Sequence, residues 1–410
     1  SSPAASAGSS SAASPLCSTR GMDGPRVLPV IPPEIVVIDQ VTDILLEHGG
    51  FASALQQVWD HELQHRHVLL ILIGDHHGRI YEHLRSYARA PLYGRFTAIW
   101  QAEPIRWADF SSAFRRWPIR DRLLAYAVTG GWPVFVKMIE SDQLPRQAMA
   151  QLISSVQYRD GVIAILDQFD PTRRAAMTKT LRALAHSAAS QLDLAKRSGL
   201  SRRVLNSVLV DLDIAELVKT DDIPIEGQLS LPQRVVFRLN DYQVRFFYRF
   251  LGATSVATSR QETLRSLKRE STGIGRFLAE LVADRLLVPW LALVGPQKKP
   301  IGLMDWIGPL PGMPACDAAL AVVDRQQRKV LICGVVGQVR PVGERRAQAF
   351  ARTAMSLVSV SWPGYVGRSL LVSLSGFTAR YRLRPSHDTH LTLDATTMVR
   401  GLARRQLKSK

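Results

Sequence analysis

The chain has 410 residues, of which 46% are hydrophobic, and it carries a formal net charge of +17. This length and composition allow two or three domains with hydrophobic cores. The longest apolar run, Val68 to Ile73, is too short to cross a bilayer and predicts a buried strand of a parallel sheet. Three cysteines, Cys17, Cys316 and Cys333, form no disulfide framework and favour a reducing compartment.

The positive charge is concentrated near the end of the sequence. From Arg325 to Lys410 there are 16 basic residues and three acidic ones. Such an excess predicts a polyanionic partner, most often nucleic acid, DNA or structured RNA, and no membrane. We expect a basic tail over 400–410, in which Arg400, Arg404 and Arg405 bind the nucleic acid. The alternative is a solvated face that only keeps the protein soluble.

The first 26 residues are dominated by Ser, Ala and Gly, with no Met before Met22 and no acid before Asp23. We expect residues 1–26 to be a disordered linker or the remnant of a processed leader. The protein is then cytoplasmic, or lies in an organellar matrix such as that of the mitochondrion if the segment is a processed transit peptide.

A βαβ unit of an α/β domain is predicted next. "EIVVID" (34–39) predicts a buried strand, and a helix follows at about Ser53–His65, with Leu55, Trp59 and Leu63 as its apolar stripe. The run Val68 to Ile73 then gives the second strand, and strand, helix and strand at this spacing form a βαβ unit. Helices broken at Gly130 and Gly131 complete this region, 27–142.

The same stretch contains "HELQH" (61–65), the His-Glu-x-x-His pattern of a zinc protease helix. His61 and His65 lie two residues past Trp59 and Leu63, so both point away from the apolar stripe. The pattern also straddles the predicted helix end. We therefore expect no zinc site, and no other metal site, here.

A winged helix-turn-helix is predicted over 143–230. Three short helices end in a strand, and Gly199 stands where the turn between the second and third helices needs it. Ser201, Arg202, Arg203 and Asn206 are the predicted nucleic-acid-binding residues of the third helix. Its predicted buried face consists of Leu205, Val208, Leu209 and Leu212. Docking of a protein is the alternative role.

The remaining regions are linker helices over 231–270 and an α/β domain over 271–399. "YQVRFFYRFL" (242–251) interleaves Arg with aromatic residues, as in RNA-stacking surfaces. Tyr242, Phe246 and Phe250 share one helix face, however, which favours a place in the core. "CDAALAVVD" and "KVLICGVVG" predict a pair of strands.

Four strings together resemble the archaeal and bacterial AAA-type ATPases of the STAND group: "EIVVIDQVTDILLEHGGFASALQQVWDHEL", "VLLILIGDHHGRIYEHL", "APLYGRFTA" and "LLAYAVTGGWPVFV". The resemblance covers about residues 27–390 and is strongest up to 140. It implies a P-loop-type ATPase core, a winged helix, and a C-terminal α/β domain similar to restriction endonucleases.

The resemblance also implies nucleotide and Mg²⁺ positions. Asp39 falls at the Walker B aspartate, and Asp75 at the end of the next strand, where the family usually has Ser after Gly. Arg95 is a candidate phosphate-sensing arginine. Gly131 and Pro133 resemble a turn that approaches the adenine, although a simple helix break explains them as well.

Three departures argue against catalysis. No G-x-x-x-x-G-K-[ST] loop occurs in the sequence, and Gln40 stands where the family has a catalytic Glu. Glu280 and Asp317 match acidic positions of an endonuclease site, but Gly334 and Val336 replace its Glu and Lys. We therefore expect a degenerate nuclease site, and ATP and Mg²⁺ to be bound weakly or not at all.

The sequence as a whole predicts a nucleic-acid-binding protein of the ATPase family, with ATP hydrolysis and nuclease chemistry lost or crippled, that acts as a regulator or scaffold. Two alternatives stay open. One is a subunit of a large ribonucleoprotein assembly similar to an organellar ribosome, and the other is a fragment of an active ATP-binding ATPase.

Overall fold

The computed structural model describes residues 34–74, 90–100, 102–166, 169–223, 234–252, 259–294, 302–303, 315–324, 326–382 and 390–406. Contacts within the chain divide it into two compact units, with the break between residues 97 and 98. Helices alternate with parallel and antiparallel sheets, so the predicted α/β fold class is confirmed. Within the described ranges, no helix combines the length and apolarity needed to cross a bilayer.

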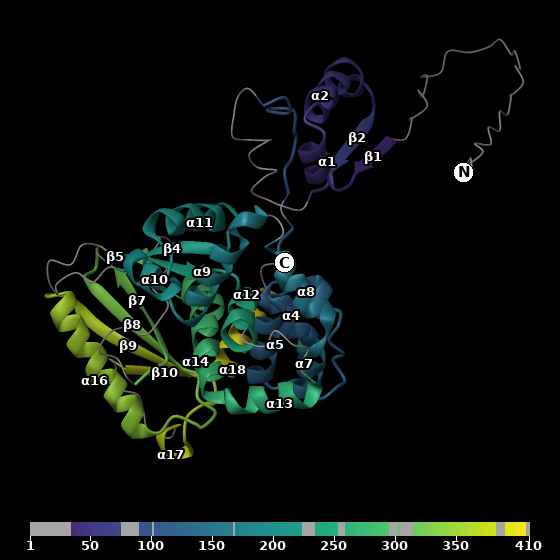
Figure 1. Cartoon of the computed structure of the whole chain (residues 1–410). Helices are drawn as coiled ribbons and strands as arrows, with labels where there is room; N and C mark the ends of the chain where they lie inside the picture. The colour runs from purple at the N-terminus through teal and green to yellow at the C-terminus, as the bar shows by residue number, and fades with distance from the viewer. Residues whose placement is uncertain are drawn as a thin grey trace, which may run out of the picture. The chain divides into compact units, whose positions relative to one another are not determined.

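The first unit contains two parallel strands and the helices between them (Figure 1). These elements are β1 (Glu34–Ile38), α1 (Val41–Glu47), α2 (Phe51–His61), the 3-10 helix η1 (Leu63–His65) and β2 (Val68–Leu72). The predicted βαβ order is therefore confirmed, but the predicted burial of the strands is wrong. Ile35, Val37 and Leu69 are 62%, 53% and 51% exposed, because the described part of this unit offers only short helices to cover a two-stranded sheet.

The second unit begins with a group of helices around an aromatic core. They are α4 (Trp107–Ala113), α5 (Ile119–Thr129), α6 (Pro133–Val136), α7 (Pro145–Ser154) and α8 (Val156–Ala164). Phe110 lies between Phe114 and Tyr126, with ring centroids 4.7 and 5.2 Å away. The helix break predicted at Gly130 is confirmed, because this residue ends α5 in the left-handed conformation.

A module of three helices and three strands follows, here called the α9–β5 module (174–239). Its elements are α9 (Arg174–His186), β3 (Ala189–Ser190), α10 (Gln191–Ser198), α11 (Arg202–Ile214), β4 (Val218–Ile223) and β5 (Arg234–Leu239), and the 3-10 helix η2 (Pro171–Arg173) precedes them. The strands form an antiparallel sheet in the order β3-β5-β4. The three predicted helices and the strand after them are confirmed.

A helical layer connects this module to the last domain. It consists of α12 (Tyr242–Phe246), the π-helix η3 (Phe247–Leu251), α13 (Arg260–Arg269), α14 (Ser271–Val282), the π-helix η4 (Ala283–Leu287) and α15 (Val288–Val294). Tyr242, Phe246 and Phe250 all pack against Phe277 of α14, with centroid distances of 5.7, 5.9 and 5.7 Å. Their predicted place in the core is confirmed.

The last domain is a three-layer arrangement around a five-stranded mixed sheet. The sheet order is β10-β9-β8-β7-β6, from β6 (Gly302–Leu303), β7 (Ala318–Asp324), β8 (Lys329–Val336), β9 (Val366–Ser373) and β10 (His390–Asp394). The predicted strand pair is confirmed, because β7 and β8 are antiparallel neighbours. α16 (Glu344–Ser361) covers one face of the sheet (Figure 1). α14 packs on β7 and β8 and belongs to a second hydrophobic cluster. α17 (Ala379–Arg382) and α18 (Ala395–Gln406) follow β9 and β10.

Three predicted boundaries do not coincide with this architecture. α4, α5 and α6 belong to the second compact unit, so the break lies at 97–98 and not at 142. The region 231–270, expected to hold linker helices, contains β5, whose alternating Val and Phe side chains suit a strand that pairs with β4. Residues 400–406 of the expected tail are part of α18, whose Met398 and Leu402 are buried.

Candidate nucleic-acid interface

The helix α11 is held in place by its cap, its turn and its apolar face. Gly199 adopts a φ of 67° after α10, and Ser201 caps α11 by accepting a hydrogen bond from the Val204 backbone N–H at 3.4 Å. The four residues predicted to form the buried face, Leu205, Val208, Leu209 and Leu212, are at most 5% exposed. That prediction is confirmed, and the helix can present only its opposite face to a partner.

The exposed face begins with the predicted contact residues. Ser201, Arg202, Arg203 and Asn206 are all exposed. Neither arginine has a hydrogen-bond or ion-pair partner within the described part of the chain. The Asn206 side-chain oxygen accepts a hydrogen bond from Gln191 of α10, which fixes the amide at the surface. Two guanidinium groups without an internal acceptor therefore stand in the first turn of α11, beside an amide.

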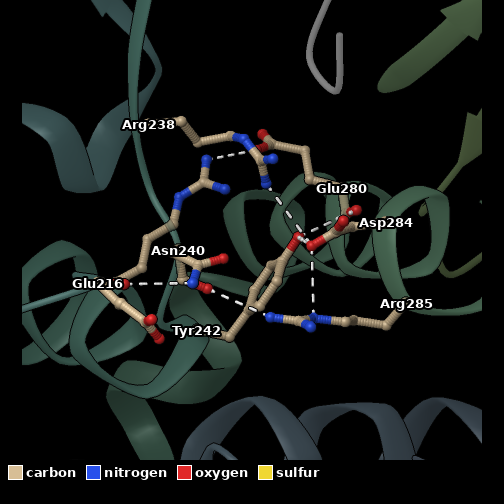
Figure 2. A network of polar contacts seen from close by, with 8 residues as sticks. Glu216, Arg238, Asn240, Tyr242, Glu280, Asp284 and Arg285 are labelled. Atoms are coloured by element: carbon tan, nitrogen blue, oxygen red, sulfur yellow. Dashed lines mark hydrogen bonds and ion pairs between the residues drawn. The ribbon is translucent and has the colours of Figure 1, made fainter. Parts of the chain in front are cut away.

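A buried polar network that includes Arg238, Tyr242 and Asp284 anchors the module to the helical layer (Figure 2). The Arg245 guanidinium of α12 is 2% exposed and pairs with the Glu280 carboxylate of α14. Tyr242 donates a hydrogen bond to Asp284 at 3.1 Å, and Arg238 of β5 lies 3.6 Å from the same carboxylate. Burial raises the pKa of Tyr242, which stays a neutral donor. These contacts fix the sheet of the module against α14 and η4.

A second basic surface lies on the module itself. A pocket of about 490 Å³ is lined by Lys179, Arg182, Ala183, His186, Ser187, Arg197 and Ser198. Arg182 donates a hydrogen bond to Gly252 O and Arg197 donates one to Ser187 Oγ, both at 2.9 Å. Both acceptors are neutral and offset none of the positive charge. The pKa of His186 is lowered, first by burial and then by the positive charges of Arg249, Arg197 and Arg245. The imidazole is therefore neutral near pH 7. The pocket is thus positive through its Lys and Arg side chains.

The predicted ATPase residues fall in different parts of the chain. Asp39 follows β1 directly and is exposed, and its carboxylate accepts a hydrogen bond from the Gln40 backbone N–H at 2.8 Å. Gln40 adopts a left-handed φ of 55° and begins α1. Asp75 lies outside the described residues. The described residues contain no glycine-rich Gly-Lys-Ser/Thr loop of the kind that holds the phosphates of ATP.

Arg95 is occupied by a protein carboxylate. Its Nε and one terminal nitrogen donate to the two Asp60 oxygens at 2.8 and 2.6 Å, and its other terminal nitrogen donates to the Pro91 carbonyl at 2.8 Å. The hydrogen bond from Arg95 lowers the pKa of Asp60, while the same bond raises the pKa of Arg95. A guanidinium used in this way joins α2 to the segment around Arg95. Its predicted phosphate-sensing role stays a prediction.

Gly131 and Pro133 form a tight turn against the chain before α4. Gly131 has a φ of 77°, and a Cβ atom there would lie 2.6 Å from the Ile105 carbonyl oxygen. Pro133 occupies the first turn of α6, where its missing N–H is harmless. The helix-break explanation suffices for both residues. They belong to the second compact unit, whereas Asp39 belongs to the first.

The two acids of the predicted nuclease site serve other purposes. Glu280 is only 7% exposed and is paired with Arg245, so it is not an ordinary exposed helix residue. Asp317 precedes β7 and accepts a hydrogen bond from the Gly337 backbone N–H at 2.8 Å. Arg276 and Arg346 both lie 3.9 Å from the Asp317 carboxylate. Each of the two carboxylates therefore already lies next to an arginine guanidinium.

A glutamate at position 334, which the resemblance implies, would clash with α16. A Cβ atom at Gly334 would lie 2.3 Å from Cε2 of the buried Phe350 ring of α16. The neighbouring Val336 is fully buried in the same apolar cluster. No carboxylate or ammonium group can occupy this face without displacing α16. Among the described residues, no three His, Cys, Asp or Glu side chains form a group able to hold a metal ion.

The remaining predicted residues lie at the ends of helices. His61 ends α2 and His65 ends η1, so the two histidines are not on one continuous α-helix. Arg400 is an exposed residue of α18. Arg404 and Arg405 belong to the same helix, but their side chains lie outside the described residues.

The sequence did not point to a group of arginines that lie in α5, in η4 and beside the two ends of α4. Arg106, Arg115, Arg122 and Arg285 line a cleft together with Arg400. The available signal was the density of arginine in "IRWADFSSAFRRWPIRDR" (105–122). The pocket of α9 and α10 was missed as well, because its residues are spaced irregularly along the chain.

Comparison with known proteins adds little to this description. No protein-family model matches the chain. The chain is 21% identical over 221 residues to an uncharacterized protein of Methanocaldococcus jannaschii, a match that covers 53% of this chain and 49% of that protein. The chain thus spans about half the length of this relative. Restriction endonuclease FokI matches at a TM-score of 0.26 and 11% identity, over 68% of this chain and 75% of that chain, too weakly to support a shared activity.

Proposed function

We propose that this protein binds nucleic acid through the exposed face of α11. In this proposal the α9–β5 module is a winged helix, α11 is its recognition helix, and the protein acts as a regulator or scaffold of the ATPase type whose ATP hydrolysis and nuclease chemistry are lost or crippled. The observation that carries the proposal is the pair of exposed guanidinium groups of Arg202 and Arg203, which have no acceptor among the described residues.

The order of elements in the module supports this assignment. Helix, short strand, helix, helix and two further strands, with the sheet order β3-β5-β4, is the arrangement in which a winged helix presents its third helix. Arg and Asn side chains at the start of that helix are donors to phosphate oxygens and base edges. The positive pocket on α9 and α10 adds charge to the same module.

The loss of catalysis is supported by what the candidate catalytic groups contact. Arg95 is held by Asp60, Glu280 is paired with Arg245, and Phe350 fills the place next to Gly334. Arg95 and Glu280 thus already have protein partners, and the position of the third group is sterically blocked. We therefore expect few side chains to be free to activate water or to stabilise a transferring phosphoryl group.

The experiment is fluorescence anisotropy of the full chain with a labelled duplex of about two helical turns, in DNA and RNA versions. Replacing both Arg202 and Arg203 with Ala should weaken binding at least about tenfold, because two charge-assisted contacts are lost. Arg368→Ala is the matched control, since Arg368 is an exposed arginine of β9 outside the module. The proposal would be contradicted if both variants changed the duplex affinity equally, or if the unmodified protein bound neither duplex.

A further inference from the structure

The second unit contains a cleft outside the α9–β5 module. Its volume is about 640 Å³, within the range of small-molecule sites. It is lined by residues of α4, α5, η4, α15 and α18 and of the turns beside them, among which are Arg106, Arg115, Arg122, Arg285 and Arg400. We call it the arginine cleft.

The arginine cleft carries a strong excess of positive charge. Five of its lining residues are arginines, and Asp284 is its single acidic lining residue. The Asp284 carboxylate is already engaged, since Tyr242 donates to it at 3.1 Å and Arg238 and Arg285 lie 3.6 and 3.4 Å away. Figure 2 shows the Arg285 side chain reaching this carboxylate. Asp284 is therefore not a counter-charge for Arg106, Arg115 or Arg400 of the cleft.

The donors of these arginines are in large part unused. Arg115 and Arg400 are exposed and have no hydrogen-bond or ion-pair partner among the described residues. Arg122 donates from one terminal nitrogen to Ser111 Oγ at 2.7 Å, but its buried Nε has no acceptor within the described ranges. Arg106 keeps only an exposed contact with Asp109, at 3.3 Å. Several guanidinium groups thus converge with free donors, which is the chemistry that binds phosphate oxygens.

The floor of the cleft is apolar and partly aromatic. Trp107, Tyr126 and Leu402 are 7%, 9% and 7% exposed and line it with Pro289 and Val399. The Trp107 and Tyr126 rings meet edge to face at a centroid distance of 5.4 Å, so their positions are fixed by packing. A ligand that fits has an anionic part for the arginines and a flat or apolar part for this floor.

We infer that the arginine cleft binds a nucleotide, with its phosphates on Arg115, Arg122 and Arg400 and its base or sugar over the floor. This is a second site, distinct from the α11 surface and from the expected nucleotide position at Asp39. The nucleotide is either free in solution or the phosphorylated end of a nucleic-acid strand, because both present the same group.

The test is calorimetry on the full chain with ATP, AMP, adenosine and inorganic tripolyphosphate, and with a 5′-phosphorylated oligothymidylate of eight nucleotides. We expect ATP to bind more tightly than tripolyphosphate, which lacks a group for the floor, and adenosine not to bind detectably. Arg115→Ala and Arg400→Ala should each weaken binding of the phosphorylated ligand about tenfold or more. Both side chains are exposed, so circular dichroism of the variants should be unchanged.

Controls separate this site from the others. Arg368→Ala and the Arg202→Ala/Arg203→Ala pair should leave ATP binding unchanged, whereas Arg115→Ala should leave duplex binding by α11 largely intact. Binding of ATP would identify a free nucleotide as the ligand, and binding of the phosphorylated oligonucleotide alone would identify a strand end. Loss of ATP binding in Asp39→Ala but not in Arg115→Ala or Arg400→Ala would overturn the inference. So would the absence of binding by every phosphorylated ligand at millimolar concentration.

Discussion

The buried guanidinium of Arg245 is paired with the carboxylate of Glu280. This pair joins α12, which follows the α9–β5 module, to α14, which packs on β7 and β8 of the five-stranded sheet. Arg245 also donates to the Ala185 carbonyl of α9 at 3.3 Å. One side chain thus contacts both the module, at α9, and the helical layer, at α14. The helix α11 of the proposed recognition surface packs on α9, which Arg245 links to α14.

Removal of one member of this pair should destabilise the protein strongly. Glu280→Ala leaves a buried, uncompensated guanidinium, and we expect a loss of about 3–5 kcal/mol in the free energy of unfolding. The measurement is urea denaturation followed by circular dichroism. The double variant Arg245→Met/Glu280→Leu is the control, and it should lose less than Glu280→Ala alone. A loss below about 1 kcal/mol for Glu280→Ala would show that the pair is not buried.

The Arg95–Asp60 contact should make the first unit sensitive to acid. The hydrogen bond from Arg95 lowers the pKa of Asp60 in the folded protein. Its stabilising effect is therefore present above the unfolded-state pKa, about 3.9, and is lost as the pH falls through the folded-state value.

Hydrogen–deuterium exchange of α2 in the Asp60→Asn variant measures this effect. At pH 7 the variant should exchange faster than the unmodified protein, and the difference should shrink below about pH 4. Arg95→Ala should behave in the same way without changing affinity for nucleotide. A nucleotide affinity that falls in Arg95→Ala, while exchange of α2 is unchanged, would support the phosphate-sensing role.

The close approach of Gly334 to Phe350 predicts that even one added methyl group destabilises the last domain. The Cβ of Gly334→Ala would lie 2.3 Å from the ring, and such overpacking typically reduces stability by about 1–3 kcal/mol. Thermal unfolding measures this. Gly49→Ala is the control, because nothing lies within 4 Å of its added Cβ. Phe350→Leu in the Gly334→Ala background should recover part of the loss, and the absence of any coupling would show that α16 moves freely.

Local patterns in the sequence were sufficient for several of these elements. The spacing of Leu205, Val208, Leu209 and Leu212 identifies the buried face of α11, and hence its exposed face, because helical periodicity is a local property. The turn at Gly199 followed from the left-handed conformation that glycine accepts.

Pairings between distant segments could not be predicted in the same way. Glu280 finds Arg245 and Asp60 finds Arg95 across 35 residues each, and no periodicity indicates which charges meet. A charged residue in an amphipathic helix is expected on the exposed face, so the burial of Glu280 contradicts its local pattern. The arginine cleft could not be predicted for the same reason, because Arg115 and Arg400 are brought together only by the packing of α18 on the helices before it.

The most direct test of the account is the salt dependence of nucleic-acid binding. The affinity of the unmodified protein for a duplex should fall linearly on a plot of log affinity against log salt concentration, with a slope proportional to the number of phosphate contacts. In Arg202→Ala/Arg203→Ala the slope should become shallower by about 1.8, which corresponds to two lost contacts with B-form DNA. A slope identical to that of the unmodified protein would show that α11 does not contact the phosphates, and would contradict the proposed interface.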